Sequence, residues 1–207
     1  MKRWYGDLER GDQAAHIYHT DNEQVRVVTD VIRWMNEGER LILLSDRWDG
    51  DHERPGALEA AMEAGQFEVI PADRAMCSCG RFRAEALRDT TAYERGRALE
   101  EGLSGLVIMW DLDWGGREAD FEAHIVERSR AALSVRPSDV TMIGQYGKGR
   151  LSEKQIDSVL RINQLVLEDG ILSRRFWVVA NRSKGRTSGS GRTIYMGLPE
   201  GADAKTL

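Results

Sequence analysis

The run Leu41-Ile42-Leu43-Leu44 is a continuous apolar segment that directly follows a stretch with helical periodicity. That stretch begins at the capping box Thr20 to Glu23 and ends near Gly38. A short apolar run after an amphipathic helix is typical of a strand that is buried on both faces. The sequence therefore predicts a helix followed by a buried strand, which is the repeating unit of a parallel α/β sheet.

The same alternation continues along the chain. Further helices are predicted over residues 55–64, 82–101 and 118–133, and in a segment that opens at the capping box 152–155 and carries Val166 and Leu167. Further buried strands are predicted at residues 67–70, 106–110 and 140–143, and a terminal β-hairpin at 176–180 and 193–196. We therefore predict an α/β fold with three layers, α/β/α, around a mostly parallel central sheet.

Length and composition set the class of protein. The 207 residues suit one domain, predicted over 14–198, with mobile ends at 1–13 and 199–207. A formal net charge of −5 disfavours binding to the phosphate backbone of a nucleic acid. No apolar run approaches the roughly 20 residues that cross a bilayer, and no secretory signal is recognised. With only two cysteines and no disulfide framework, we expect a cytoplasmic protein.

Polar and aromatic residues follow three of the predicted strands. In open α/β sheets, ligands bind beyond the carboxyl ends of the strands. The residues at these ends are the candidate ligand-binding set: Asp46, Arg47, Trp48, Asp111, Asp113, Trp114, Gln145 and Tyr146. We predict that the aromatic members Trp48, Trp114 and Tyr146 line one cleft for a small molecule, with polar contacts from the others. The alternative is that strand-end loops are simply polar and that Trp114 packs in the core.

No catalytic or phosphate-binding motif is present. The phosphate-loop pattern G-x-x-x-x-G-K-[ST], the nucleophile elbow and the His-Glu-x-x-His helix are all absent. We therefore expect no enzymatic activity and no cofactor. The predicted strand before Asp111 is apolar and ends in an acidic residue, as strands of nucleotide hydrolases do. A divergent nucleotide-binding protein or ATPase is therefore the alternative.

Metal-binding signals are weak. Cys77 and Cys79, with His52 as a distant partner, fall short of the four ligands of a closed zinc site, so two reduced thiols are the simpler interpretation. His16 and His19 would face opposite sides of a strand. His124, on a helix with acidic neighbours, is predicted to be solvated or locally paired.

His16-Ile17-Tyr18 is followed by a polar turn, a helix and Gly38-Glu39-Arg40 before a strand. This arrangement resembles the start of the domain in the MEDS family, which comprises sensory domains of methanogen and methylotroph proteins. Residues 101–108 resemble its glycine-led entry to a central strand, Asp113-Trp114 its tryptophan after that strand, and Phe121-Glu122 its aromatic-glutamate pair. The resemblance covers residues 14–180 and implies a RecA- or KaiC-like fold without a phosphate loop.

The chain departs from the family pattern at two places. Gly144 or Gln145 stands where the family has a cysteine before a tyrosine, and Arg161-Ile162-Asn163 lies near the position of a missing His-Pro pair. If those residues contact a ligand elsewhere in the family, the ligand or its chemistry differs here.

The resemblance favours a ligand-sensing module without catalysis. Because no output segment is recognised, we expect a homo-oligomer, most simply a dimer, or a separate output protein. An interaction subunit that acts through its helix faces is a further alternative. A DNA-binding repressor is least favoured, because no helix-turn-helix signature is present.

Overall fold

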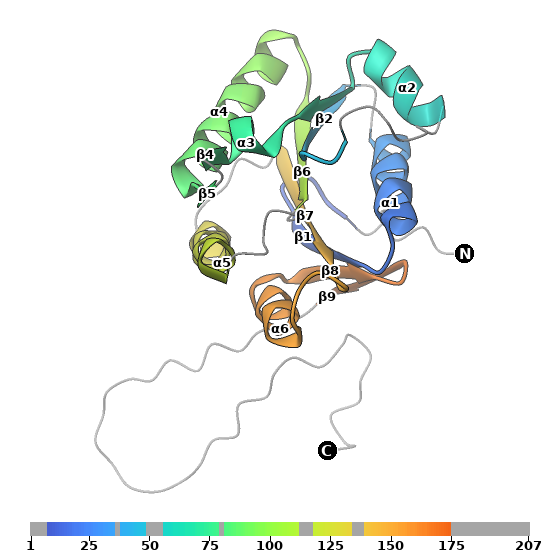
Figure 1. The fold of residues 1–207 in the computed structure, drawn as a ribbon. Helices are drawn as coiled ribbons and strands as arrows, with labels where there is room; N and C mark the ends of the chain where they lie inside the picture. Colours follow the sequence, from blue (N-terminus) through green and yellow to red (C-terminus); the bar gives the residue numbers. More distant parts are fainter. Residues whose placement is uncertain are drawn as a thin grey trace, which may run out of the picture.

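Seven strands form the central sheet, in the order β3-β2-β6-β7-β1-β8-β9 (Figure 1). Their bounds are β1 (Gln13–Tyr18), β2 (Glu39–Leu44), β3 (Phe67–Ile70), β6 (Gly105–Asp111), β7 (Val140–Gly147), β8 (Leu165–Glu168) and β9 (Ile171–Arg174). All neighbouring pairs are parallel except β8 and β9, which form an antiparallel hairpin. The structure, a computed structural model, describes residues 8–35, 38–48, 56–78, 81–111, 118–133 and 139–174.

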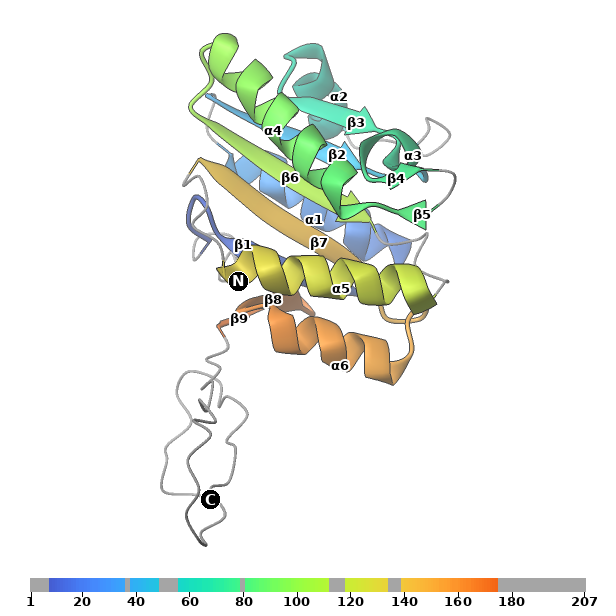
Figure 2. The same cartoon turned by 90° about the vertical axis from the view of Figure 1, so that its left-hand side faces the viewer.

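Helices cover both faces of the sheet. The helix bounds are α1 (Asp21–Trp34), α2 (Gly56–Glu63), α3 (Ala72–Ala75), α4 (Ala84–Glu100), α5 (Glu118–Leu133) and α6 (Glu153–Ile162). Helices α1 and α2 contribute to the core on one face, and α4, α5 and α6 pack on the other (Figure 2). A small antiparallel pair, β4 (Cys77–Ser78) and β5 (Arg81–Phe82), lies beside α3 and α4. The predicted three-layer α/β/α fold with a mostly parallel sheet is confirmed.

Strand β2 shows why the continuous apolar run is informative. Leu41 and Leu43 pack in the core beneath α1, whereas Ile42 and Leu44 pack in the core on the opposite face. All of these side chains are fully buried, and burying one such side chain stabilises a protein by about 1.5–3 kcal/mol. A strand that helices cover on both sides therefore carries apolar residues on both faces, instead of alternating apolar and polar residues.

Helix α1 begins where the capping box predicts. The Thr20 hydroxyl accepts a hydrogen bond from the Glu23 N–H, and the Glu23 side chain accepts from the Thr20 N–H. These bonds satisfy N–H groups that have no partner inside the helix. Among the described residues, every helix is too short or too polar to cross a bilayer.

The central strand β1 is absent from the sequence-based assignment. It lies between β7 and β8, and it begins at Gln13 with Leu8 already buried in the core, so ordered structure starts before residue 14. Its interior residue His16 interrupts the apolar run that identifies the other central strands.

The C-terminal elements differ from the prediction. Helix α6 ends before Asn163, whose side-chain amide donates to the Val159 carbonyl, so Val166 and Leu167 belong to strand β8 rather than to the helix. The hairpin predicted at 176–180 and 193–196 lies outside the described residues. The hairpin that the structure describes is β8–β9.

Candidate functional site

Three buried polar side chains lie in a row across adjacent strands. In the sheet register, Gln145 of β7 pairs with His16 of β1 on one side and with Asp111 of β6 on the other. Paired residues point to the same face of a sheet, so the three side chains share the face covered by α1. Their exposed fractions are 0% for Gln145, 2% for Asp111 and 3% for His16. Most of this interior is apolar, which makes such a row unusual.

Hydrogen bonds link this row to α1 and to the end of β1. The Tyr18 hydroxyl donates to Asp111 Oδ1 at 3.3 Å, and Gln24 Nε2 of α1 donates to Gln145 Oε1 at 3.1 Å. Gln145 Nε2 is buried and has no hydrogen-bond partner among the described residues. Leaving a buried donor unsatisfied costs about 1–3 kcal/mol. Gln145 therefore carries an unused hydrogen-bond donor near the carboxyl ends of the strands.

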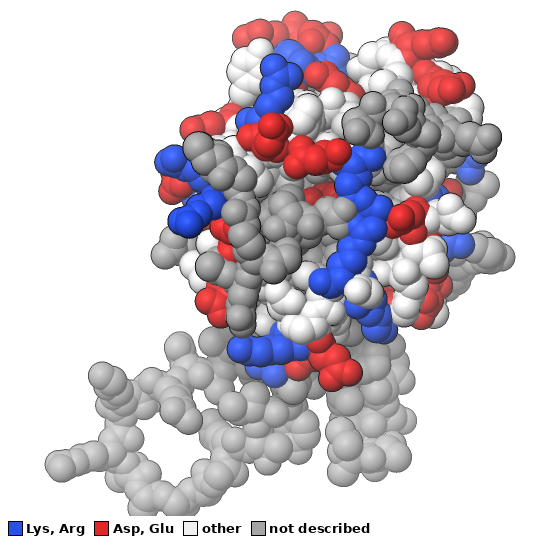
Figure 3. Space-filling view, viewed as in Figure 1, with Lys and Arg blue, Asp and Glu red and all other residues white. Residues whose placement is uncertain are grey.

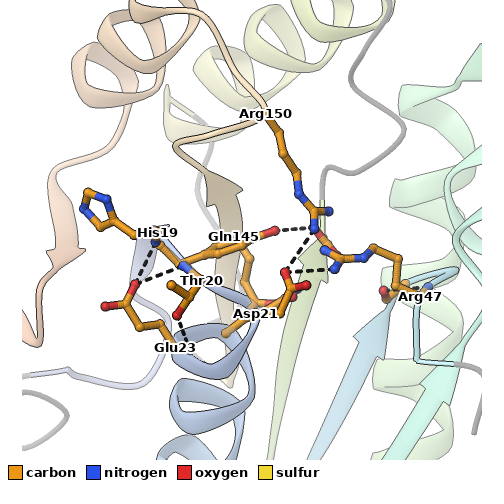
Figure 4. Close-up of polar contacts among 11 residues, drawn as sticks. His19, Thr20, Asp21, Glu23, Arg47, Gln145 and Arg150 are labelled. Carbon is orange, nitrogen blue, oxygen red and sulfur yellow. Dashed lines mark hydrogen bonds and ion pairs between the residues drawn. The ribbon is translucent and has the colours of Figure 1, made fainter. Parts of the chain in front are cut away.

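Two arginines close the outer side of the row. Arg47, after β2, and Arg150, after β7, both reach Asp21 Oδ1, at 2.9 Å and 3.0 Å (Figure 4). Arg47 Nη1 also lies 3.6 Å from Asp111 Oδ2. Figure 3 shows Lys and Arg side chains in a column down the middle of this view, flanked by Asp and Glu. The site thus combines two cations with two carboxylates, one exposed and one buried.

Burial shifts the pKa values of the titratable groups in this row. It raises the pKa of the Asp111 carboxyl, against the hydrogen bond from Gln24 and the charge of Arg47, which lower it. Burial also raises the pKa of the Tyr18 hydroxyl, and the neighbouring Asp111 charge adds to that effect. Burial lowers the pKa of His16 to about 3, so this imidazole is neutral at pH 7.

Gly147 permits the close packing of Tyr18 and Arg150. A Cβ at Gly147 would lie 3.1 Å from Arg150 Cδ and 3.1 Å from Tyr18 Cζ and its hydroxyl oxygen. A larger residue at the end of β7 would therefore require Tyr18 or Arg150 to shift by a few tenths of an ångström.

The turn between β1 and α1 already holds an anionic group. The Glu23 carboxylate accepts from the His19 N–H at 2.7 Å and from the Thr20 N–H at 3.4 Å (Figure 4). The hydrogen bond from His19 is the main reason why the pKa of Glu23 is lowered. The N–H groups of this turn are therefore used internally and do not form a phosphate cradle.

Comparison with protein families identifies this architecture. The family model of MEDS, the methanogen/methylotroph DcmR sensory domain, matches residues 14–163. The chain belongs to the MEDS family. The resemblance seen in the sequence is thereby confirmed, and the family is one of sensory domains.

Similarity to other known proteins is distant. No curated protein matches this MEDS domain. A KaiC-like protein from the archaeon Pyrococcus horikoshii OT3 is 14% identical with a TM-score of 0.44, over 84% of this chain and 81% of that one. The EssC ATPases 2 and 3 from Geobacillus thermodenitrificans are 9% identical with a TM-score of 0.35, over 76% of this chain and 32% of that one. The chain thus spans about a third of that EssC structure.

Three of the predicted site residues meet in the MEDS domain, namely Arg47, Asp111 and Gln145. Sequence reasoning missed their other neighbours, which are Tyr18, Asp21, Gln24 and Arg150. Tyr18 and Gln24 were not predicted as site residues, because β1 was not recognised as a central strand. Asp113 and Trp114 lie outside the described residues.

The predicted single aromatic cleft is wrong for the two aromatic members that the structure describes. Trp48 packs edge-on against Phe67 in the core beneath α1 and α2, whereas Tyr146 is fully buried on the opposite face of the sheet. The reason is the alternation of a strand: β7 continues to Gly147, so Gln145 and Tyr146 point to opposite faces. Asp46 accepts from the Asp73 N–H and, with Trp48, lines a separate cleft of about 940 Å³ beside β3.

His124 also differs from expectation, because it is fully buried rather than solvated. Its Nε2 lies 3.2 Å from the Tyr146 hydroxyl, and its ring packs edge-on against Phe82 and Trp110. The described residues contain no group of three side chains able to hold a metal ion. Cys77 is buried, and Cys79 lies outside the described residues.

Proposed function

We propose that this MEDS domain is a non-catalytic sensory module that binds a small molecule at the carboxyl ends of β1, β6 and β7. The observation that carries the proposal is Gln145, a fully buried amide whose Nε2 has no hydrogen-bond partner among the described residues. It lies beside Asp111 near the carboxyl ends of parallel strands, where ligands commonly bind. A bound molecule that accepts from Nε2 would satisfy this donor.

The surroundings of Gln145 suit ligand binding better than catalysis. Asp111, with its raised pKa, is held by Tyr18 and Arg47. His16 is neutral and buried beneath α1. Among these groups the Tyr18 hydroxyl bonds the Asp111 carboxylate, but no Ser, Thr or Cys nucleophile is paired with a base, whereas donors and acceptors for a polar ligand are abundant.

Nucleotide binding is the alternative, and the geometry of the β1–α1 turn opposes it. His19 and Thr20 form this turn without a glycine, and their N–H groups bond the Glu23 carboxylate. A triphosphate would meet the carboxylates of Glu23 and Asp21 at this position.

A sensory domain needs a surface through which ligand binding changes an output. We propose that this surface is the interface of a homodimer or the contact with a separate output protein. Asp21 couples α1 to the segments after β2 and β7 through Arg47 and Arg150, so a ligand at this site would act on three elements at once.

The direct test is native mass spectrometry of the chain purified from its own host. We expect a bound small molecule that is lost in Gln145→Leu, because leucine keeps the volume and removes the amide. The matched control is Gln13→Leu, at the opposite end of neighbouring β1, which should retain the ligand. Melting curves of both variants establish that they fold. If folded Gln145→Leu retains the same ligand, the site is elsewhere.

A further inference from the structure

The position between Arg47 and Arg150 suggests the chemical class of the ligand. We infer that the ligand is a small monocarboxylate whose carboxylate takes the place that the Asp21 carboxylate occupies between these two arginines. The inference rests on the proposed function, because it specifies what binds at the same site. It also implies that the Asp21 carboxylate competes with the ligand for the two arginines.

The first observation is that both guanidinium groups converge on one oxygen. Arg47 Nη2 and Arg150 Nη2 lie 2.9 Å and 3.0 Å from Asp21 Oδ1, although the two arginines follow different strands (Figure 4). Guanidinium groups match carboxylates in geometry and bind them more strongly than neutral acceptors. The site is therefore already arranged around a carboxylate.

The second observation is the difference in burial between the two carboxylates. The Asp21 side chain is 62% exposed, whereas Asp111, which also attracts Arg47, is 2% exposed. Arg47 and Arg150 are less exposed, at 21% and 36%, so solvent screens these ion pairs mainly on the Asp21 side. A free carboxylate can therefore compete with Asp21 for the two arginines, while Asp111 continues to orient Arg47.

The third observation concerns what lies beneath the arginines. The Asp111 carboxylate opposes a ligand with several negative charges, because like charges repel in a poorly hydrated site. The buried Gln145 amide and the Tyr18 hydroxyl instead offer neutral hydrogen-bonding groups. One negative charge plus a polar, uncharged body fits this combination better than a phosphate dianion.

The experiment is an NMR titration of the full chain with acetate, following the Nε–H signals of Arg47 and Arg150. The wild type is compared with Asp21→Asn, which keeps the shape of the side chain and removes its charge. Asp157→Asn is the matched control, because Asp157 is similarly exposed at 66% and pairs with Arg161 on α6. Acetamide, the neutral counterpart of acetate, and inorganic phosphate are titrated in parallel.

We expect Asp21→Asn to bind acetate roughly tenfold more tightly than the wild type and the Asp157→Asn control. Acetamide should not shift the arginine signals, and phosphate should bind more weakly than acetate. Arg150→Gln should abolish the gain when combined with Asp21→Asn. Unchanged or weaker acetate binding in folded Asp21→Asn overturns the inference, as does tighter binding of phosphate.

These outcomes are separable from the proposed function. A host ligand that has no carboxylate and is lost from Gln145→Leu would support the proposed sensory site and contradict the inference that the ligand is a carboxylate. Acetate binding that depends on Asp21, together with a host ligand that Gln145→Leu still binds, would support the arginine subsite and contradict the proposed sensory site.

Discussion

The Tyr18 hydroxyl donates a hydrogen bond to Asp111 Oδ1 at 3.3 Å, joining residues that are 93 positions apart. Tyr18 ends β1 and Asp111 ends β6, and β7 lies between these strands. The bond therefore spans the carboxyl edge of the sheet above the buried Gln145. It also holds a carboxylate whose pKa is raised by burial.

Asp111→Asn should make the chain more stable at pH 7. Because the folded-state pKa of Asp111 is raised, burial of its charged form opposes folding above that pKa, and protonation relieves this cost as the pH falls. Asparagine removes the charge, and its carbonyl oxygen can still accept from Tyr18. We expect the melting temperature to rise by roughly 2–4 °C, the shift that 1 kcal/mol produces in a chain of this size. The gain should shrink at acidic pH, and a lower melting temperature at pH 7 would contradict the prediction.

His16→Gln should weaken the acid sensitivity of the fold. The pKa of His16 is lowered from 6.5 to about 3, so between these values the unfolded chain binds a proton that the folded chain does not. The free energy of unfolding of the wild type therefore falls as the pH drops through this range, by up to about 1.4 kcal/mol per pH unit. Urea unfolding at several pH values should show that the free energy of unfolding depends less steeply on pH in the variant than in the wild type. Equal slopes would show that the protonated imidazole is tolerated.

Gly144→Ala should destabilise the chain, whereas Gly96→Ala should stabilise it. A Cβ at Gly144 would lie 2.7 Å from the ring and hydroxyl of Tyr146, which is fully buried and bonded to His124. Such overpacking costs about 1–3 kcal/mol. A Cβ at Gly96 in α4 meets nothing within 4 Å, and alanine is favoured over glycine in a helix by about 0.5–1 kcal/mol. Thermal melts of the two variants should shift in opposite directions, and a shift in the same direction would refute the packing argument at Tyr146.

Mg-ATP should bind weakly or not at all. The N–H groups of the β1–α1 turn bond the Glu23 carboxylate, so no set of free N–H groups is offered to a triphosphate there. Calorimetric titration with and without magnesium measures this directly. A dissociation constant in the micromolar range would instead favour the nucleotide-binding alternative.

The chain should form a homodimer in solution. A sensory domain passes on a ligand-dependent change through an interface, and a two-fold dimer is the simplest such assembly. Light scattering at high micromolar concentration should give twice the mass of the 23.4 kDa chain. A monomer mass under these conditions would leave the separate output protein as the route of signalling.

The sequence by itself determined the layers and most of the elements. Continuous apolar runs such as Leu41 to Leu44 identify strands buried on both faces, and the capping box at Thr20 predicts the start of α1. These signals are local, because burial on both faces and capping depend on residues close together in the chain. The same signals brought out Arg47, Asp111 and Gln145 as residues at strand ends.

Only the tertiary structure decided which of those residues meet. Gln145 and Tyr146 are adjacent in the chain, yet the two-residue period of β7 sends one toward α1 and the other toward His124. The contact of Asp21 with Arg150 joins residues 129 positions apart and depends on β1 lying next to β7. Strand order and register arise from the packing of the whole sheet, which no short stretch of sequence encodes.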